Sequence, residues 1–261
     1  MSIEPGFSKF DAEEYLDEYY RYVSPENHGL LKFWAESFTE EDNGKIMADI
    51  GGGPTLYSLI TPAKYVSEIH FSDYSLANII AVTNWIKSID GSYNWNEFIR
   101  QALELEGLEN PTDDDVNKRA ALLRKKITKL QQCDITKKHP LKVLNAKKVR
   151  NTYDIVSSNF VAESITDTID EWKELVENVA SLVDPAKGSS LILSSLLEAD
   201  FYKVDNVRNK AAYITRKEIF DLLRSLGFSR IVWKTIPADI LDPNDPNFEG
   251  YRGLSIVRAF R

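Results

Sequence analysis

A run of three glycines and a later aspartate are the residues of this chain best suited to holding a ligand. The glycines at 51–53 directly follow the apolar run 46–50, and Asp73 lies 20 positions beyond Gly53. Glycine permits a sharp turn and a close approach of the backbone to a ligand, and an acid at this distance can accept both hydroxyls of a ribose. The third glycine of the dinucleotide fingerprint is missing, because Leu56 stands there.

A further acid, Asp49, lies just before the glycines. It would repel a pyrophosphate but can hold a cationic cofactor. S-adenosylmethionine fits this description, since it combines an adenosine with a sulfonium and an amino group. The alternative interpretation is an ordinary strand and turn with a surface acid. A P-loop is excluded because no Gly-Lys-Ser/Thr sequence follows the glycines.

Alternating strands and helices must position these residues. The run 46–50 is expected to be a buried parallel strand, and Pro54 is expected at the first position of a helix whose free N–H groups face the ligand. The remaining expected strands are 66–72, 127–132, 153–160, 190–197, 231–236 and 253–260. The expected helices are 7–23, 26–39, 75–89, 115–128, 168–183 and 216–227, and 203–213 is expected to be a flexible loop. This order predicts an α/β fold that binds its ligand at the carboxyl ends of the strands.

Composition excludes several classes of function. The chain has 261 residues and a net charge of −8, which disfavours a nucleic-acid partner. Its one cysteine and three scattered histidines give no metal-binding pattern, so no metal is expected. No apolar run is long enough to span a membrane, and the N-terminus lacks a signal pattern. We therefore expect a cytoplasmic protein.

The segment Asp49-Ile50-Gly51-Gly52-Gly53-Pro54-Thr55-Leu56-Tyr57, followed by Ser72-Asp73-Tyr74-Ser75 and Asn78, resembles the nicotinamide, phenylethanolamine and indolethylamine N-methyltransferase family. The resemblance covers nearly the whole chain. It implies a Rossmann-like class I methyltransferase fold, with a seven-stranded, mostly parallel sheet, a C-terminal antiparallel hairpin and an N-terminal helical lid. It also implies one domain over 1–261, with the lid at 1–43, a helical insert at 91–128 and a substrate loop at 198–214.

The resemblance further implies which residues form the site. The cofactor-binding residues would be Tyr15, Tyr20, Asp49, Gly51, Gly52, Gly53, Thr55, Tyr57, Asp73, Tyr74, Asn78, Cys133, Asp134, Ile135, Asn159 and Phe160. The substrate-binding residues would be Glu163, Glu198, Tyr202 and Tyr251. Glu163 would also be the catalytic residue, either as an anchor for a protonated amine or as its base. Ordinary structural roles for Glu163 and Tyr251, as a glutamate at a helix start and a tyrosine on a surface loop, remain open.

These residues predict S-adenosylmethionine-dependent methylation of a nitrogen in a small amine or N-heteroaromatic molecule. The transfer is an in-line displacement that needs orientation rather than a protein nucleophile. Three alternatives remain open: an O- or S-methyltransferase on the same fold, a catalytically silent cofactor-binding protein, and a nicotinamide-dependent oxidoreductase, against which Leu56 argues. We expect a monomer that acts on a small molecule.

Overall fold

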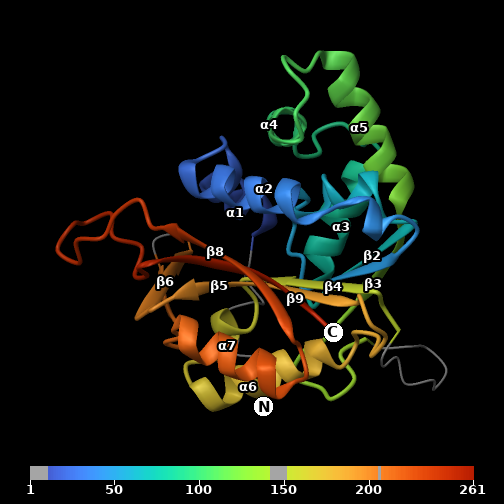
Figure 1. The fold of residues 1–261 in the computed structure, drawn as a ribbon. Helices are drawn as coiled ribbons and strands as arrows, with labels where there is room; N and C mark the ends of the chain where they lie inside the picture. Colours follow the sequence, from blue (N-terminus) through green and yellow to red (C-terminus); the bar gives the residue numbers. More distant parts are fainter. Residues whose placement is uncertain (1–10, 142–151, 205–206) are drawn as a thin grey trace. The chain divides into compact units, whose positions relative to one another are not determined.

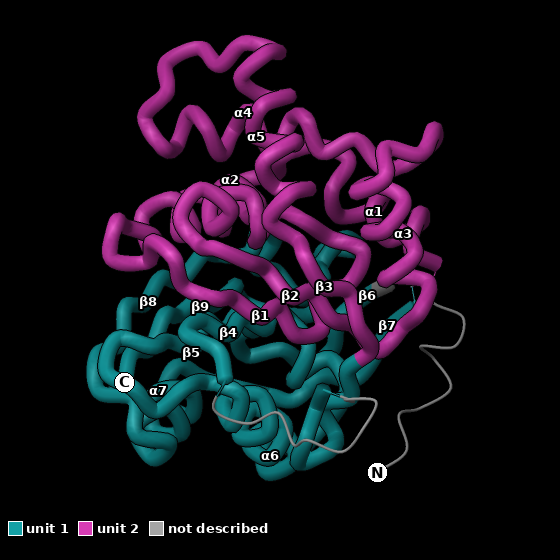
Figure 2. Tube along the Cα trace, turned by 90° about the vertical axis from the view of Figure 1, so that its right-hand side faces the viewer, with its two compact units in different colours: residues 1–9, 133–261 teal, residues 10–132 magenta. Residues whose placement is uncertain are grey.

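The computed structural model describes residues 11–141, 152–204 and 207–261. Two compact units make up the chain (Figure 2). We call the described residues up to Gln132 the N-terminal unit, and those from Cys133 to Arg261 the C-terminal unit. Residues 1–10 of the predicted lid and residues 205 and 206 of the predicted substrate loop lie outside the described part.

Within the described residues, the main sheet has seven strands in the order β3-β2-β1-β4-β5-β9-β8. Figure 1 draws the strands as arrows and labels most of them. The strands are β1 (Ile46–Ile50), β2 (Glu68–Asp73), β3 (Ile127–Gln132), β4 (Ile155–Asn159), β5 (Ser190–Leu197), β8 (Arg230–Pro237) and β9 (Gly253–Phe260). The pairs β1–β2, β2–β3 and β4–β5 are parallel, whereas β9 runs antiparallel to both β5 and β8. The predicted sheet with its C-terminal antiparallel hairpin is confirmed.

The N-terminal unit contains α1 (Ala12–Tyr20), α2 (Pro25–Ser37), α3 (Leu76–Ile86), α4 (Asn96–Leu105) and α5 (Asp113–Lys126). Side chains at the helix starts explain several of these boundaries. Asp11 accepts hydrogen bonds from two backbone N–H groups of α1, and Ser24 accepts one from α2. Unpaired N–H groups in the first turn of a helix are satisfied in this way.

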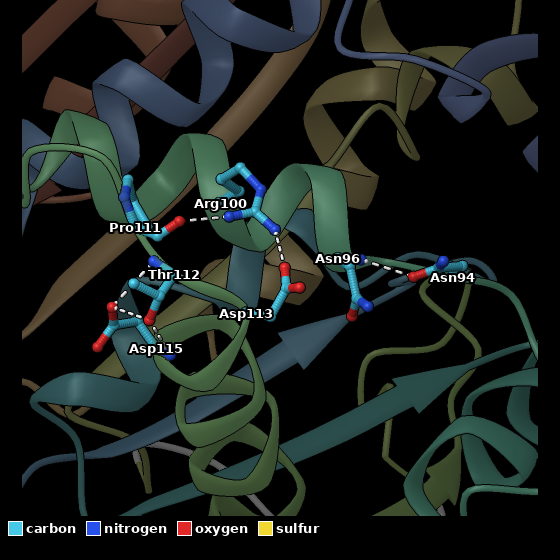
Figure 3. A network of polar contacts seen from close by, with 7 residues as sticks. All are labelled: Asn94, Asn96, Arg100, Pro111, Thr112, Asp113 and Asp115. Carbon is cyan, nitrogen blue, oxygen red and sulfur yellow. Dashed lines mark hydrogen bonds and ion pairs between the residues drawn. The ribbon is translucent and has the colours of Figure 1, made fainter.

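The helical insert is a pair of helices held by polar contacts at the turn between them. Arg100 of α4 donates to the backbone oxygen of Pro111 and pairs with Asp113 (Figure 3). Thr112 and Asp115 form a capping box at the start of α5. The helix expected at 115–128 therefore begins earlier, at Asp113, directly after its cap residue Thr112.

The segment after the glycine turn differs from the prediction. No α-helix begins at Pro54; two short 3₁₀ helices occupy Tyr57–Leu59 and Pro62–Lys64. Pro62 explains the difference, because a proline there would clash with the carbonyl group four residues earlier in an α-helix. The expected helix dipole is therefore absent from the glycine loop.

The C-terminal unit contains α6 (Ile169–Ala180) and α7 (Arg216–Ser225). α7 packs on β8 through Phe220 and Trp233, whose ring centroids are 5.3 Å apart. The prediction of a flexible loop over 203–213 was wrong. β6 (Phe201–Val204) and β7 (Val207–Lys210) form a two-stranded antiparallel sheet there, because hydrogen bonds between the two extended segments satisfy their backbone groups.

The apolar side chains of each unit form a buried core. In the N-terminal unit, the largest buried side chains include Trp34, Phe71 and Trp95, and in the C-terminal unit they include Trp172 and Phe228. None of the described helices is long and apolar enough to cross a membrane.

Candidate functional site

The glycine turn after β1 is shaped for a close approach of the backbone to a ligand. Gly51 and Gly53 have φ angles of 72° and 63°, in the left-handed region that favours glycine. A Cβ atom on Gly52 would collide with the side chains of Phe71 and Asp49. The N–H groups of Gly51 and Gly52 donate to the backbone oxygen of Ser72, at 2.9 and 3.1 Å. The turn is therefore tied to the end of β2.

Asp73 at the end of β2 bonds directly to this turn. Its Oδ2 accepts a hydrogen bond from Gly53 N at 2.8 Å, and its Oδ1 accepts bonds from Ser75 N at 2.8 Å and Asn78 Nδ2 at 3.0 Å. Burial raises the pKa of the Asp73 carboxyl, and the three donors oppose that rise. The Oδ1 of Asn78 is buried and has no partner among the described residues. An acid at the end of β2 and an unused acceptor on α3 thus lie beside each other, and ribose hydroxyls can donate hydrogen bonds to both.

Three tyrosines of the N-terminal unit form a cluster, and one of them is close enough to Asp73 to be affected by its charge. The ring of Tyr20 lies 6.0 Å from that of Tyr15 and stacks on that of Tyr57 at 5.5 Å. Burial raises the pKa of Tyr15 to about 12, and the charge of Asp73 contributes to this rise. Burial also raises the pKa of Tyr20 well above its usual range. These phenols are therefore neutral hydrogen-bond donors throughout the physiological pH range.

The other predicted cofactor residues of this unit divide into two groups. Asp49 is fully buried and Thr55 nearly so, with the Thr55 hydroxyl donating to Gly52 O at 2.8 Å. Tyr74 is 50% exposed, and its side chain is not part of the tyrosine cluster. Tyr93, which the sequence did not single out, donates its hydroxyl to the backbone oxygens of Leu16 and Tyr20 and so ties α1 to the following segment.

The C-terminal unit holds the remaining predicted cofactor-binding residues. Cys133 is a buried thiol. Asp134 Oδ1 accepts bonds from the backbone N–H and the hydroxyl of Thr136, at 3.0 and 2.6 Å. Ile135 is buried, and its backbone oxygen accepts a bond from Asn178 at 3.0 Å. These bonds fix the conformation of the segment after β3.

The end of β4 is strained and held by side-chain hydrogen bonds. Phe160 has a φ angle of 58°, which is rare for a bulky residue. Its N–H donates to the backbone oxygen of Ser194 at 3.0 Å, and the Ser194 hydroxyl donates to Asn159 Oδ1 at 2.7 Å. The Tyr202 hydroxyl donates to Ser164 O at 2.9 Å. Strain of this kind clusters at functional sites.

Glu163 follows on the 3₁₀ helix Glu163–Ile165 and is fully buried. Its Oε1 accepts a bond from Leu196 N at 2.9 Å. Burial raises the pKa of its carboxyl from 4.5 to about 7, and the Leu196 N–H and the Ser195 hydroxyl oppose the rise. The carboxyl is therefore held against β5 rather than exposed at a helix start.

The remaining predicted substrate residues lie in the same unit. Glu198 is exposed and has a φ angle of 50°, and its N–H donates to Ile214 O at 2.8 Å. Tyr251 is only 8% exposed, so its interpretation as a surface-loop tyrosine was wrong. The hydrogen bond between Ser194 and Asn159 could not be predicted from local patterns, because it depends on the register between β4 and β5.

The glycine turn, a buried acid with a neighbouring unused acceptor, and neutral phenols lie in the N-terminal unit. These groups can hold a cationic cofactor that contains an adenosine. Within the described ranges, no group of three or more His, Cys, Asp or Glu side chains could hold a metal ion.

Solved methyltransferase structures share this fold. Magnesium protoporphyrin IX methyltransferase from Synechocystis with bound SAM matches with a TM-score of 0.51 and 15% identity, covering 91% of this chain and 79% of that one. A DhpI-SAM-HEP complex matches with a TM-score of 0.52 and 11% identity, covering 95% and 91%. The fold is that of the Rossmann-like class I methyltransferases.

The chain belongs to the NNMT/PNMT/TEMT family, whose model matches residues 2–242. It is therefore an S-adenosylmethionine-dependent methyltransferase. Mouse indolethylamine N-methyltransferase is 26% identical and aligns over 84% of this chain and 82% of its own length. Human nicotinamide N-methyltransferase is 22% identical over 97% of both chains. Human phenylethanolamine N-methyltransferase is 22% identical over 87% of this chain and 80% of its own.

Proposed function

We propose that the enzyme methylates the nitrogen of a small amine or N-heteroaromatic molecule. The observation that carries this choice is the buried carboxyl of Glu163, whose pKa of about 7 suits the removal of a proton from an amine near neutral pH. The names of the relatives support a nitrogen acceptor, since each is an N-methyltransferase.

We assign cofactor contacts to residues of each unit separately. Asp73 would accept hydrogen bonds from the ribose hydroxyls. The backbone of the glycine turn would contact the cofactor. The other assigned residues of the N-terminal unit are Tyr15, Tyr20, Asp49, Thr55, Tyr57, Tyr74 and Asn78. The assigned residues of the C-terminal unit are Cys133, Asp134, Ile135, Asn159 and Phe160. Of these, Tyr74 has the weakest support because its side chain is half exposed.

When bound, S-adenosylmethionine supplies a methyl group on a sulfonium, which makes the methyl electrophilic. The chain's own residues bind, orient and exclude water. Asp49 and the neutral phenols face a cationic cofactor with a carboxylate and aromatic surfaces. Orienting two reactants in this way can supply about 7–11 kcal/mol of the barrier reduction.

Glu163 acts chiefly as a proton acceptor in this proposal. A carboxyl with a pKa of about 7 is partly protonated near neutral pH, so it holds a cation less firmly than an ordinary glutamate. It takes up the proton of an amine more readily for the same reason. Glu198, Tyr202 and Tyr251 are assigned to the substrate. Acceptors with oxygen or sulfur remain the alternative, and no contact among the described residues favours them.

The proposal includes a monomeric, cytoplasmic enzyme without a nucleic-acid partner. The net charge of −8 supports the last point, because nucleic-acid phosphates would be repelled.

Calorimetric titration with S-adenosylhomocysteine tests the cofactor site. Asp73→Ala removes the acceptor of three hydrogen bonds. We expect the affinity of this variant for S-adenosylhomocysteine to fall roughly 100-fold, since charge-assisted bonds contribute about 1.5–3 kcal/mol each. Asp114→Ala, at an exposed acid on α5, is the matched control. Equal affinities in the wild type and Asp73→Ala would refute the assignment.

A product-mass screen over amines, pyridines, phenols and thiols tests the acceptor. We expect methylated nitrogen compounds, and Glu163→Gln should lower kcat/KM for amines by about 10²-fold or more. Its affinity for S-adenosylhomocysteine should stay within about twofold of the wild type, because Glu163 makes no assigned contact with the cofactor. Exclusive methylation of oxygen or sulfur would overturn the choice of acceptor.

A further inference from the structure

Three buried oxygens of the C-terminal unit lack a hydrogen-bond partner among the described residues: Glu163 Oε2, Ser195 Oγ and Ser255 Oγ. None of the three side chains is more than 1% exposed. Glu163 lies next to Ser195 on β5, because its Oε1 accepts the N–H of the following residue, Leu196, at 2.9 Å, and the Ser195 hydroxyl lowers the pKa of the Glu163 carboxyl. Orphaned buried hydroxyls are costly, so a cluster of them beside one carboxyl needs an explanation.

The strand register places these hydroxyls in a row. Ser195 of β5 lies opposite Ser255 of β9, and Ser255 lies opposite Thr235 of β8. Residues directly opposite on antiparallel strands point to the same face, with Cβ atoms about 4.5–5.5 Å apart. The row therefore crosses three strands on one face of the sheet.

The row ends at solvent. Thr235 is exposed, and β8 is the last strand of the sheet order. The Thr235 hydroxyl accepts a bond from Trp233 Nε1 at 2.8 Å. Since Trp233 packs on Phe220 of α7, this is the face that α7 covers. The row thus runs from a fully buried carboxyl to the edge of the sheet.

The neighbouring row offers no such route. Ser158 of β4 is also buried and has no partner among the described residues. Its row continues through Leu193 and Val257 to Trp233. Two aliphatic side chains interrupt it, whereas every position from Ser195 to Thr235 carries a hydroxyl.

We propose that Ser195, Ser255 and Thr235, with water between them, conduct protons between buried Glu163 and solvent at the β8 edge. Neither buried serine is assigned a contact with substrate or cofactor; both act through Glu163. A hydroxyl both accepts and donates, and a buried water can bond about three orphaned polar atoms. This inference rests on the proposed role of Glu163 as the base.

The proton balance is simple. The N–H bond of the amine breaks and an O–H bond forms on Glu163. The carboxylic acid then releases its proton to the row, where each hydroxyl accepts one proton and donates one. The net result is one proton delivered to solvent, with no change of oxidation state.

Charged groups on the surrounding elements have contacts of their own, and the guanidinium of Arg216 of α7 lies over the Trp233 ring, 5.3 Å from its centroid. Lys210 of β7 pairs with Asp167 at 2.9 Å, Arg258 of β9 donates to Ser190 Oγ at 3.1 Å, and Glu218 of α7 caps its own helix. No charged side chain is among the causes that shift the pKa of Glu163. The serine hydroxyl is thus the side chain that acts on this carboxyl.

Hydrogen–deuterium exchange of the Glu163 carboxylic acid tests the row without any cofactor. The protonated carboxyl is followed at pH 6 by the isotope shift of its infrared C=O band, which is identified by its loss in Glu163→Gln. We expect roughly tenfold slower exchange in Ser255→Ala, because the proton must then await a local opening of the fold. Ser255→Thr should restore the rate, and Ser158→Ala should leave it unchanged. Equal rates in Ser255→Ala and the wild type would overturn the inference.

Methyl transfer distinguishes failure of this inference from failure of the proposed function. If the row conducts protons during methyl transfer, we expect Ser255→Ala to lower kcat and leave KM unchanged, and Glu163→Gln to lose activity. If exchange depends on the row but Glu163→Gln keeps full activity, Glu163 is not the base, and the catalytic role of the row falls with it. If Glu163→Gln is inactive but Ser255→Ala exchanges at the wild-type rate, Glu163 keeps its role as the base and proton conduction along the row is refuted.

Discussion

Gly53 and Asp73, 20 residues apart in the sequence, are joined by a hydrogen bond of 2.8 Å from the Gly53 N–H to Asp73 Oδ2. The bond links the turn after β1 to the end of β2, so the conformation of the turn and the position of the acid depend on each other. Any change that moves one is expected to move the other.

Gly52→Ala should therefore weaken cofactor binding strongly. A Cβ there collides with Phe71 and Asp49, and the turn must shift to avoid them. We expect S-adenosylhomocysteine affinity to fall at least roughly 100-fold in calorimetry, because a misplaced turn loses several contacts at once. The double variant Gly52→Ala/Phe71→Leu should recover part of the affinity. No loss in the single variant would show that the turn is not part of the site.

Tyr15→Phe should weaken S-adenosylhomocysteine binding by about tenfold, the value of one hydrogen bond. Because the pKa of Tyr15 is about 12, its phenol remains protonated, and the wild-type affinity should not change with tyrosine ionisation between pH 7 and 10. Tyr22→Phe, at a side chain 66% exposed, is the control. An affinity that falls with a midpoint near the ordinary tyrosine pKa would contradict the buried phenol.

Glu163 should make the protein less stable as pH rises. Its pKa is about 7 in the folded chain against an ordinary 4.5, so the folded state binds more protons between these values. The stabilising contribution is complete below pH 4.5 and is lost as pH rises through 7, by about 3 kcal/mol. Above pH 8, Glu163→Gln should be more stable than the wild type in urea denaturation. The advantage should vanish at pH 4.5; a constant difference would contradict the raised pKa. Exposed Glu174→Gln serves as control.

The ion pair of Arg119 and Glu106 should stabilise the helical insert. Arg119 donates both terminal nitrogens to Glu106 at 2.7 Å, and both side chains are less than 10% exposed. Glu106→Ala leaves a buried cation and should lower the free energy of unfolding by about 3–5 kcal/mol.

The exposed pair of Arg100 and Asp113 in the same insert is the matched control (Figure 3). Asp113→Ala should cost no more than about 1 kcal/mol, because solvent screens an exposed pair. Equal losses in the two variants would contradict the role of burial.

Local patterns were sufficient for much of the fold. The predicted strands 127–132 and 190–197 match β3 and β5, because short runs with apolar and β-branched residues favour strands. Thr215, predicted before a helix at 216, begins α7 with a capping box. The spacing of the glycines and Asp73 placed the turn and the acid at the ends of two neighbouring parallel strands, and the bond from Gly53 N–H to Asp73 Oδ2 joins them there; the ribose-binding role of Asp73 stays a prediction.

Other features depended on contacts between distant segments. The 3₁₀ helices after Pro54 and the β6–β7 pairing replaced an expected helix and loop. The family resemblance pointed to Glu163, but burial against β5 decided its pKa. The row through Ser195, Ser255 and Thr235 exists only in the register of three strands. Residue types and spacing report local geometry, whereas burial and register follow from packing of segments that the sequence does not place side by side.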